Sequence, residues 1–170
     1  MNGFRFNLWQ HPVGQGGFHT GSLVECGDSP SCQPVPGAPE FRWAYDCGSN
    51  QVDELNQEIK VVAGTEFDVL FLSHLDSDHV NGVDKLLANS GVKEVVLPHL
   101  DNVDWVLHLA AGINDGTISG TFVDLASDPA GWFGRRGVER LTYVETDRDD
   151  REGGPPQGPL APIDHRKENL

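Results

Sequence analysis

An uninterrupted apolar run that ends in a cluster of ionisable side chains is the feature that most constrains the fold of this chain. Residues 69–72 read VLFL, and residues 73–79 continue as SHLDSDH. A strand that is apolar at every position has to be covered on both faces, which is typical of a central strand in an α/β sheet. In such sheets the functional groups gather where the strands end. The sequence therefore predicts an α/β fold with a site directly after this strand.

Strand-like and helix-like patterns alternate along the rest of the chain. We expect strands over residues 4–9, 21–25, 41–46, 67–73, 92–97, 121–125 and 139–145. We expect helices over residues 52–61, from 83 to just before Gly91, and over 103–111, with Asn50 as the N-cap of the first. A glycine-rich turn over residues 11–18 joins the first two strands. This order predicts a mixed sheet that opens with antiparallel strands and is flanked by helices.

Length and charge limit the classes of protein that remain. The 170 residues suffice for one domain, which we place over residues 1–145, and the polar, proline- and glycine-rich residues 146–170 indicate a flexible tail or linker. The net charge of −14 repels phosphate backbones and counts against a protein that coats nucleic acid. A nuclease stays compatible with it, because bound divalent cations reverse the local charge. Neither a signal-peptide pattern nor a membrane-length apolar run is present, so a cytoplasmic protein is expected.

The cysteines form neither a recognisable zinc site nor a disulfide framework. There are three of them, Cys26, Cys32 and Cys47, and no CxxC spacing occurs. Cys26 and Cys32 could close a small surface loop, or they could be free thiols.

Four ionisable residues at the end of the apolar strand form the candidate site: His74, Asp76, Asp78 and His79. Imidazole nitrogens and carboxylate oxygens together suit zinc, manganese or iron. Two carboxylates held close together repel each other, and a divalent cation between them removes that cost and lowers the pKa of a bound water. The alternative is a solvated acidic turn in which the aspartates only cap a helix. The apolar strand before the cluster, and Gly82 with a helix after it, favour the metal site.

Three motifs in order along the chain resemble the metallo-β-lactamase fold family. They are Val13-Gly14-Gln15-Gly16-Gly17, Asp46-Cys47-Gly48 and His74-Leu75-Asp76-Ser77-Asp78-His79. The family signature is H-x-H-x-D-H, so Asp76 stands where its second histidine would be. This variant resembles the branch found in the soluble domain of the bacterial DNA-uptake channel protein ComEC. That branch opens with a V-G-Q-G-D-like turn. Residues 13–17 match this pattern except at the last position, where Gly17 stands in place of the aspartate. The resemblance covers the chain from about Phe4 to Pro98.

The resemblance implies a layered αββα fold and metal-dependent hydrolysis. His74 and Asp76 would be ligands of one metal ion, and Asp78 and His79 of a second, with Zn²⁺ as the first choice and Mn²⁺ as an alternative. Asp78 would also orient the attacking water, and Asp46 would support the loop without binding metal. A metal-bound hydroxide would then attack the substrate. The preference for a phosphodiester of the nucleic-acid type, as in a nuclease, rests on the resemblance to the DNA-uptake branch.

The second half of the family fold has no clear counterpart in this sequence. A strand that ends in T-G-D is expected there, and Thr121-Phe122-Val123-Asp124 is a poor match. The chain therefore resembles a half or truncated sandwich, which would leave an apolar sheet face in water. We expect self-association or a partner chain to cover that face. The alternative function is a catalytically incomplete scaffold or partner subunit in a multi-component bacterial system, for example in phage defence.

Other candidate residues lie outside these motifs. Arg135 and Arg136 could hold a phosphate, although two exposed loop arginines are the plainer interpretation. His99 follows a strand and could lie near the site. The remaining histidines, which are expected in loops, in a helix or in the tail, are His11, His19, His108 and His165.

Overall fold

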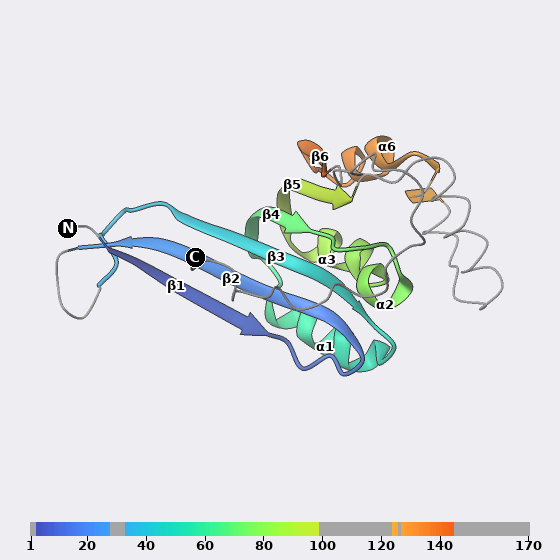
Figure 1. Ribbon diagram of the computed structural model, residues 1–170, viewed down its shortest axis with the longest axis horizontal. Coiled ribbons are helices and arrows are strands. Elements are labelled where there is room, and N and C mark those ends of the chain that lie inside the picture. The colour runs from blue at the N-terminus through green and yellow to red at the C-terminus, as the bar shows by residue number, and fades with distance from the viewer. Residues whose placement is uncertain (1–2, 28–32, 99–123, 126, 145–170) are drawn as a thin grey trace, which may run out of the picture.

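The computed structural model of the 170-residue chain describes residues 3–27, 33–98, 124–125 and 127–144. Six strands form one sheet, in which they follow the order of the chain, β1-β2-β3-β4-β5-β6 (Figure 1). The strands are β1 (Gly3–Gln10), β2 (Gly16–Cys26), β3 (Glu40–Ser49), β4 (Glu66–Phe71), β5 (Gly91–Pro98) and β6 (Arg140–Val144). The described helices include α1 (Val52–Val61), α2 (Ser77–Val80), α3 (Val83–Asn89) and α6 (Pro129–Gly134).

The type of strand pairing changes once across the sheet, from antiparallel to parallel. The pairs β1–β2 and β2–β3 are antiparallel, whereas the pairs β3–β4, β4–β5 and β5–β6 are parallel. A parallel pair needs a crossover, which α1 supplies between β3 and β4, and which α2 and α3 supply between β4 and β5. This mixed sheet with flanking helices confirms the predicted α/β class and is consistent with the metallo-β-lactamase type of fold. No helix among the described residues is long and apolar enough to span a membrane.

Two details near the start of the chain differ from the prediction. The N-cap of α1 is Gln51 rather than Asn50, and the hydroxyl of Ser49 accepts the Gln51 backbone N–H at 2.8 Å. The predicted glycine-rich turn is shorter, because β2 already begins at Gly16, and His19 therefore lies in a strand rather than in a loop. Pairing with β3 from Gly16 onward, and with β1 from His19 onward, holds this segment extended.

The strand predicted over residues 121–125 is wrong where the structure describes it. Asp124 and Leu125 are helical, and the Asp128 N–H donates to the Asp124 carbonyl at 3.2 Å. Leu125 is buried, and a short apolar run that suits a buried strand suits a buried helical turn equally well. The helix predicted over 103–111 and the tail predicted over 146–170 lie outside the described residues.

The helices pack against one face of the sheet, which we name the covered face. Ala44, Leu70 and Val95 lie next to one another on β3, β4 and β5, and all three are fully buried. Leu55 of α1 and Leu86 of α3 belong to the same core cluster. Burial of apolar surface of this kind, at roughly 25 cal/mol per Å², is the main force that holds the helices on the sheet.

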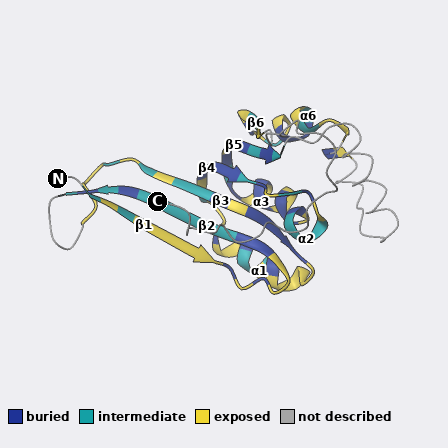
Figure 2. Ribbon diagram, in the orientation of Figure 1, coloured by how far each residue is buried: buried dark blue, intermediate teal, exposed yellow. Residues whose placement is uncertain are grey.

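The opposite face of the sheet, which we name the open face, carries large apolar side chains. Residues paired across neighbouring strands lie on the same face, so Trp43 shares this face with Val69, and Tyr45 shares it with Phe71. Figure 2 shows β1, at the edge of the sheet, as mostly exposed. Exposed large apolar residues of the first three strands include Phe4, Phe6, Leu8, Phe41 and Tyr45. As far as the described residues go, one covered and one open face are the arrangement expected of half a sandwich.

Candidate metal centre

The end of β4 and the short helix α2 bring three of the four predicted ligands together. His74, Asp78 and His79 each offer a ligand atom, and these atoms all lie within 4.8 Å of one another. The two imidazole rings are in contact, with a centroid separation of 3.8 Å. Asp76 does not belong to this group of three, and its side chain is 57% exposed, but its Oδ2 lies 3.5 Å from His74 Nε2. The structure thus places all four residues at one end of the sheet.

A change from strand to helix within a few residues produces this arrangement. The chain leaves the sheet after Leu72, whose N–H still donates to a carbonyl of β5 at 2.9 Å. Asp76 is the extended N-cap residue of α2, and its carbonyl accepts the His79 N–H at 2.9 Å. The single turn of α2 then presents Asp78 and His79 as neighbours toward His74. The alternation of histidine and aspartate noted in the sequence therefore spans a strand end, a bend and a helical turn.

Asp46, inside β3, supports this loop from the neighbouring strand. It is 2% exposed and has a φ of +53°, the left-handed backbone region that aspartate tolerates better than most residues. Its carboxylate accepts the Ser73 N–H at 2.8 Å, the Ser73 hydroxyl at 2.7 Å, and the His79 Nδ1–H at 2.8 Å. A buried carboxylate is unfavourable without such partners. Asp46 therefore contacts the loop as a support, in the position that the resemblance implied for it.

These hydrogen bonds determine the protonation pattern of both imidazoles. The carboxylate of Asp46 can only accept, so His79 Nδ1 carries the proton that it donates to Asp46. The hydroxyl of Ser73 donates to Asp46, so His74 Nδ1 donates its own proton to Ser73 Oγ at 2.7 Å. In the neutral form of each ring, Nε2 then carries the free lone pair, and this is the form of histidine that binds metal.

Each of these free nitrogen atoms faces one carboxylate. His74 Nε2 lies 3.5 Å from Asp76 Oδ2, and His79 Nε2 lies 4.0 Å from Asp78 Oδ2. Zinc binds nitrogen and oxygen ligands at about 2.0–2.2 Å, so ligand atoms separated by 3.5 to 4.0 Å can share one ion. The donor set therefore fits divalent metal. The two pairs are also those that the resemblance implies for two separate ions.

Glycines on β2 and β3 allow α2 to lie directly on the sheet. A Cβ atom at Gly48 would come within 2.5 Å of the backbone N and C of His79. A Cβ atom at Gly17 would come within 2.8 Å of His79 Nδ1 and 3.0 Å of the Asp46 carboxylate. Gly16 has a φ of +148° and faces the carbonyl of Asp78. Gly16, Gly17 and Gly48 are thus required by the close approach of the metal loop.

Asn81 is a supporting residue that the sequence did not single out. Its side-chain amide accepts the Ser49 N–H at 3.0 Å and donates to the Ser49 carbonyl at 2.9 Å. The amide group therefore pairs with the backbone of β3 as a neighbouring strand would, and it ties the end of α2 to the sheet. Ser73, which bonds Asp46 through its N–H and its hydroxyl, is a second supporting residue of this kind. The only signal in the sequence was the presence of polar residues on either side of the His–Asp cluster.

Cys47 lies beside Asp46 but is not a candidate ligand. It is a free cysteine and fully buried. Burial raises the pKa of the Cys47 thiol far above its usual range, and the negative charge of Asp46 raises it further. The thiol therefore keeps its proton, whereas a metal requires the thiolate. Cys26, by contrast, is disulfide-bonded. Of the two alternatives that the sequence left for this residue, a disulfide or a free thiol, the structure shows the disulfide.

The buried thiol predicts a loss of stability in alkaline solution. The unfolded chain releases the Cys47 proton above the usual pKa of 9.0, while the folded chain retains it. The free energy of unfolding is therefore expected to fall above this pH, by up to about 1.4 kcal/mol per pH unit. Urea unfolding from about pH 7 to 10 measures the slope. Cys47→Ala is expected to remove it, and an equal slope in the variant would contradict the assignment.

The two neighbouring arginines already have acidic partners. Arg136 donates from Nε to Asp84 at 2.6 Å, and its guanidinium lies 3.5 Å from the centroid of the Trp132 ring. Arg135 Nη1 lies 3.7 Å from the carboxylate of Asp128. Arg136 therefore fastens α6 to α3, and these contacts favour a structural role over phosphate binding.

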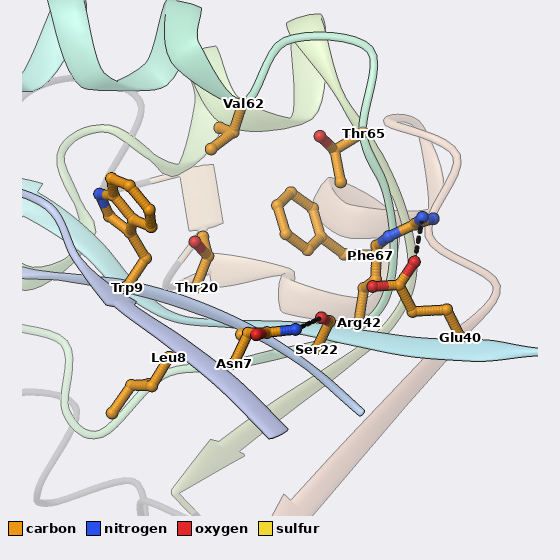
Figure 3. Close-up of a pocket in the computed structure, with 11 residues that line it drawn as sticks. Asn7, Leu8, Trp9, Thr20, Ser22, Glu40, Arg42, Val62, Thr65 and Phe67 are labelled. Atoms are coloured by element: carbon orange, nitrogen blue, oxygen red, sulfur yellow. Dashed lines mark hydrogen bonds and ion pairs between the residues drawn. The ribbon is translucent and has the colours of Figure 1, made fainter. Parts of the chain in front are cut away.

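A separate pocket of about 220 Å³ lies between the first strands and the end of α1 (Figure 3). Trp9, Val62 and Phe67 form apolar parts of its wall, and none of the four predicted metal ligands lines it. Thr20, which also lines the pocket, forms a hydrogen bond from its hydroxyl group to His11 Nε2 at 2.9 Å. His11 Nδ1 forms a second hydrogen bond to a carboxylate oxygen of Glu58 on α1, also at 2.9 Å. His11 thus joins β2 to α1 and is a buried structural residue.

Comparisons with known proteins leave the site to be judged on its own geometry. No protein-family model matches the sequence, and no curated protein matches it. Among solved structures, the chain is similar to the crystal structure of a long form RNase Z from yeast, with 13% sequence identity and a TM-score of 0.34. The similarity covers 82% of this chain but 17% of the yeast chain, so the chain spans a small part of that protein's length.

Proposed function

We propose that this chain is a metal-dependent hydrolase whose substrates are phosphodiesters of the nucleic-acid type. The observation that supports it most is the position of Asp46. This buried carboxylate accepts a hydrogen bond from Nδ1 of His79 directly. It is linked to Nδ1 of His74 through the hydroxyl group of Ser73. Both rings are thereby fixed with their free nitrogen toward a carboxylate, which is how proteins prepare histidine ligands for metal. A solvated acidic turn would not require this buried network.

In this proposal the four predicted residues hold two divalent cations. His74 and Asp76 would hold one ion, and Asp78 and His79 would hold the other, with Zn²⁺ preferred and Mn²⁺ as the alternative. A cation bound here supplies positive charge for the phosphate oxygens and lowers the pKa of a coordinated water. Asp78 would orient that water and accept its proton. Asp46 would keep His79 in one tautomer throughout and would not touch the substrate.

The proposed phosphodiester preference rests on the resemblance of the sequence motifs to the DNA-uptake branch. The chain has a net charge of −14, which opposes the approach of a polyanion. Bound cations would reverse the sign of the charge at the cluster itself. We therefore expect cleavage to depend on loaded metal both for chemistry and for substrate binding.

A second candidate function is a catalytically incomplete scaffold or partner subunit, for example in a multi-component bacterial defence system. The observation in its favour is the exposure of Asp76, which stays outside the group of three ligand atoms within 4.8 Å. Three ligands can hold a single ion without supporting two-metal chemistry. Metal content therefore separates the two proposals.

Replacing Asp78 or His79 with alanine is expected to lower the metal content. The protein is stripped with a chelator, reloaded with Zn²⁺ or Mn²⁺, and measured by elemental analysis. The hydrolase should bind about two equivalents, and each variant should lose about one of them together with at least about 100-fold of its chelator-sensitive cleavage of a chromogenic phosphodiester. Each variant removes one ligand of the same proposed ion.

Two matched variants control for the loss of an acidic or an imidazole group elsewhere. Asp53 is exposed in the first turn of α1, and His19 lies in β2 against the Tyr45 ring. Asp53→Ala and His19→Ala should both retain full metal content. Unchanged metal content in both Asp78→Ala and His79→Ala would refute the site, whereas a metal content of one equivalent or less in the unaltered protein would favour the scaffold.

A further inference from the structure

Within the part of the chain that the structure describes, the outer edge of β1 lacks the sequence features that usually prevent strands from pairing between molecules. β1 is the first strand of the sheet and pairs with β2 on one side, in a register that runs without interruption from Gly3 to Gln10. Proteins normally protect such edges with proline, bulges or several charges. Residues 3–10 read GFRFNLWQ, which contains no proline and a single charged residue, Arg5.

The side chains of β1 are unusually exposed for their type. The relative exposure is 65% for Phe4, 61% for Phe6, 59% for Leu8 and 65% for Trp9. Phe6 lies in ring contact with Trp43 of β3, at a centroid distance of 5.3 Å, so it belongs to the apolar surface of the open face. Contiguous apolar surface of this kind marks an interaction site more often than a chance feature.

The hydrogen bonds of β1 show which backbone groups point away from the sheet. The His11 N–H donates to the Phe18 carbonyl at 3.0 Å, in the same register that pairs Gln10 with His19. Backbone direction alternates along an antiparallel strand, so the odd-numbered residues bond β2. The N–H and C=O groups of Phe4, Phe6 and Leu8 therefore point outward, from residues whose side chains lie on the open face.

We propose that β1 pairs with β1 of a second copy of this chain, antiparallel about a two-fold axis, to join the two six-stranded sheets into one. In the register that we propose, Phe6 lies opposite Phe6 of the second copy, and Phe4 lies opposite Leu8 of the second copy. These are the residues with outward backbone groups, and each such pair exchanges two hydrogen bonds. The open faces of the two copies then form one continuous apolar surface.

The side chains of β1 are complementary to themselves in this register. On the covered face, Arg5 lies opposite Asn7 of the second copy, so the only charge of the strand meets a neutral amide. Trp9 lies opposite Gly3 of the second copy, and a Cβ at Gly3 would meet nothing within 4 Å, so the indole has room to cover the glycine backbone. No like charges face each other across the axis. This self-complementarity favours a second copy over an unrelated chain.

The net charge of the chain predicts how the stability of the dimer depends on ionic strength. Two copies with a net charge of −14 each repel one another at long range, although the paired strands carry no acidic residue. Added salt screens the repulsion, and it strengthens apolar contacts rather than weakening them. The dimer should therefore tighten as the ionic strength rises, unlike an association held by ion pairs. The inference is independent of metal binding at the candidate site.

Light scattering coupled to size-exclusion chromatography measures the association, because the chain mass of 18.5 kDa should double. Phe6→Lys places two lysines opposite each other on the axis and is expected to weaken the dimer at least about tenfold. The matched control is Tyr45→Lys, at a residue that is 42% exposed on the open face but belongs to β3. The control should stay dimeric, and circular dichroism should show that both variants are folded.

A pair of opposite charges tests the register itself. Phe4→Lys and Leu8→Glu should each weaken the dimer, and an equimolar mixture of the two should recover it, because Lys and Glu then face each other across the axis. A monomeric unaltered protein at its highest soluble concentration in high salt would overturn the proposal. Equal loss of the dimer in Phe6→Lys and Tyr45→Lys would also overturn it, because it would indicate association through the face rather than through the edge.

Discussion

Replacing Asp46 with alanine is expected to abolish metal binding at the candidate centre and to lower the free energy of unfolding by about 3 kcal/mol or more. The change leaves the Ser73 N–H and the His79 Nδ1–H without their acceptor. Buried polar groups without a partner cost about 1–3 kcal/mol each. Alanine also tolerates a φ of +53° less well than aspartate does. Urea unfolding and elemental analysis of the reloaded variant measure the two effects.

Asp46→Asn is the control that separates charge from shape. Asparagine keeps the size of the side chain, tolerates the same backbone region, and can still accept the His79 proton through Oδ1. Its amide group cannot accept from Ser73, so part of the network is lost. We expect a smaller loss of stability, about 1 kcal/mol, and a 10- to 100-fold weaker metal affinity. Full metal content in Asp46→Ala would show that this carboxylate does not orient the ligands.

Gly48→Ala is expected to displace α2 from the sheet, although it adds only one methyl group. The new carbon would come within 2.5 Å of the His79 backbone and 2.6 Å of the carbonyl carbon of Asp78. Neither is the end of a flexible side chain, so the whole turn has to move. Overpacking of this kind costs about 1–3 kcal/mol. Displacement of α2 also lengthens the hydrogen bond from His79 to Asp46. Metal affinity should therefore fall by about 10- to 100-fold.

Gly27→Ala is the matched control for this substitution. A Cβ at Gly27 would meet nothing within 4 Å, and its backbone does not lie in the left-handed region. The change should alter the free energy of unfolding by less than about 0.5 kcal/mol and leave metal binding unaffected. Thermal unfolding and a competition titration with a chromogenic chelator compare the two variants. Equal behaviour of Gly48→Ala and Gly27→Ala would mean that α2 does not lie as close to the sheet as the structure shows.

Much of the fold could be predicted because its patterns are local. α1 lies where the spacing of Leu55 and Ile59 placed it, since an amphipathic helix carries its period within its own sequence. The apolar run over residues 69–72 correctly indicated a strand in the middle of the sheet, between β3 and β5. The helical Asp124 and Leu125 were mistaken for a strand, because burial of a short segment is decided by distant residues. The same reason explains why β2 begins earlier than predicted, at Gly16, which pairs with Ser49 of β3.

The candidate site was predictable in its residue types but not in its supporting contacts. The alternation from His74 to His79 indicates metal ligands by composition alone. The roles of Ser73 and Asn81 depend on contacts with Asp46 and Ser49, which lie on another strand and far away in the sequence. Single serines and asparagines are common in turns, so nothing local distinguishes these two. The pairing of each imidazole with a particular carboxylate likewise required the three-dimensional arrangement.

The hydrogen bonds that link both imidazoles to Asp46 affect how the two rings move together. His79 forms a hydrogen bond to Asp46 directly, and His74 is linked to Asp46 through the hydroxyl group of Ser73. Thermal displacement of β3 relative to the neighbouring strand would therefore carry both rings in the same direction. The separation between the two coordinating nitrogen atoms would change less than the position of either one. A pair of ions held by these rings would keep its spacing while the surrounding sheet fluctuates.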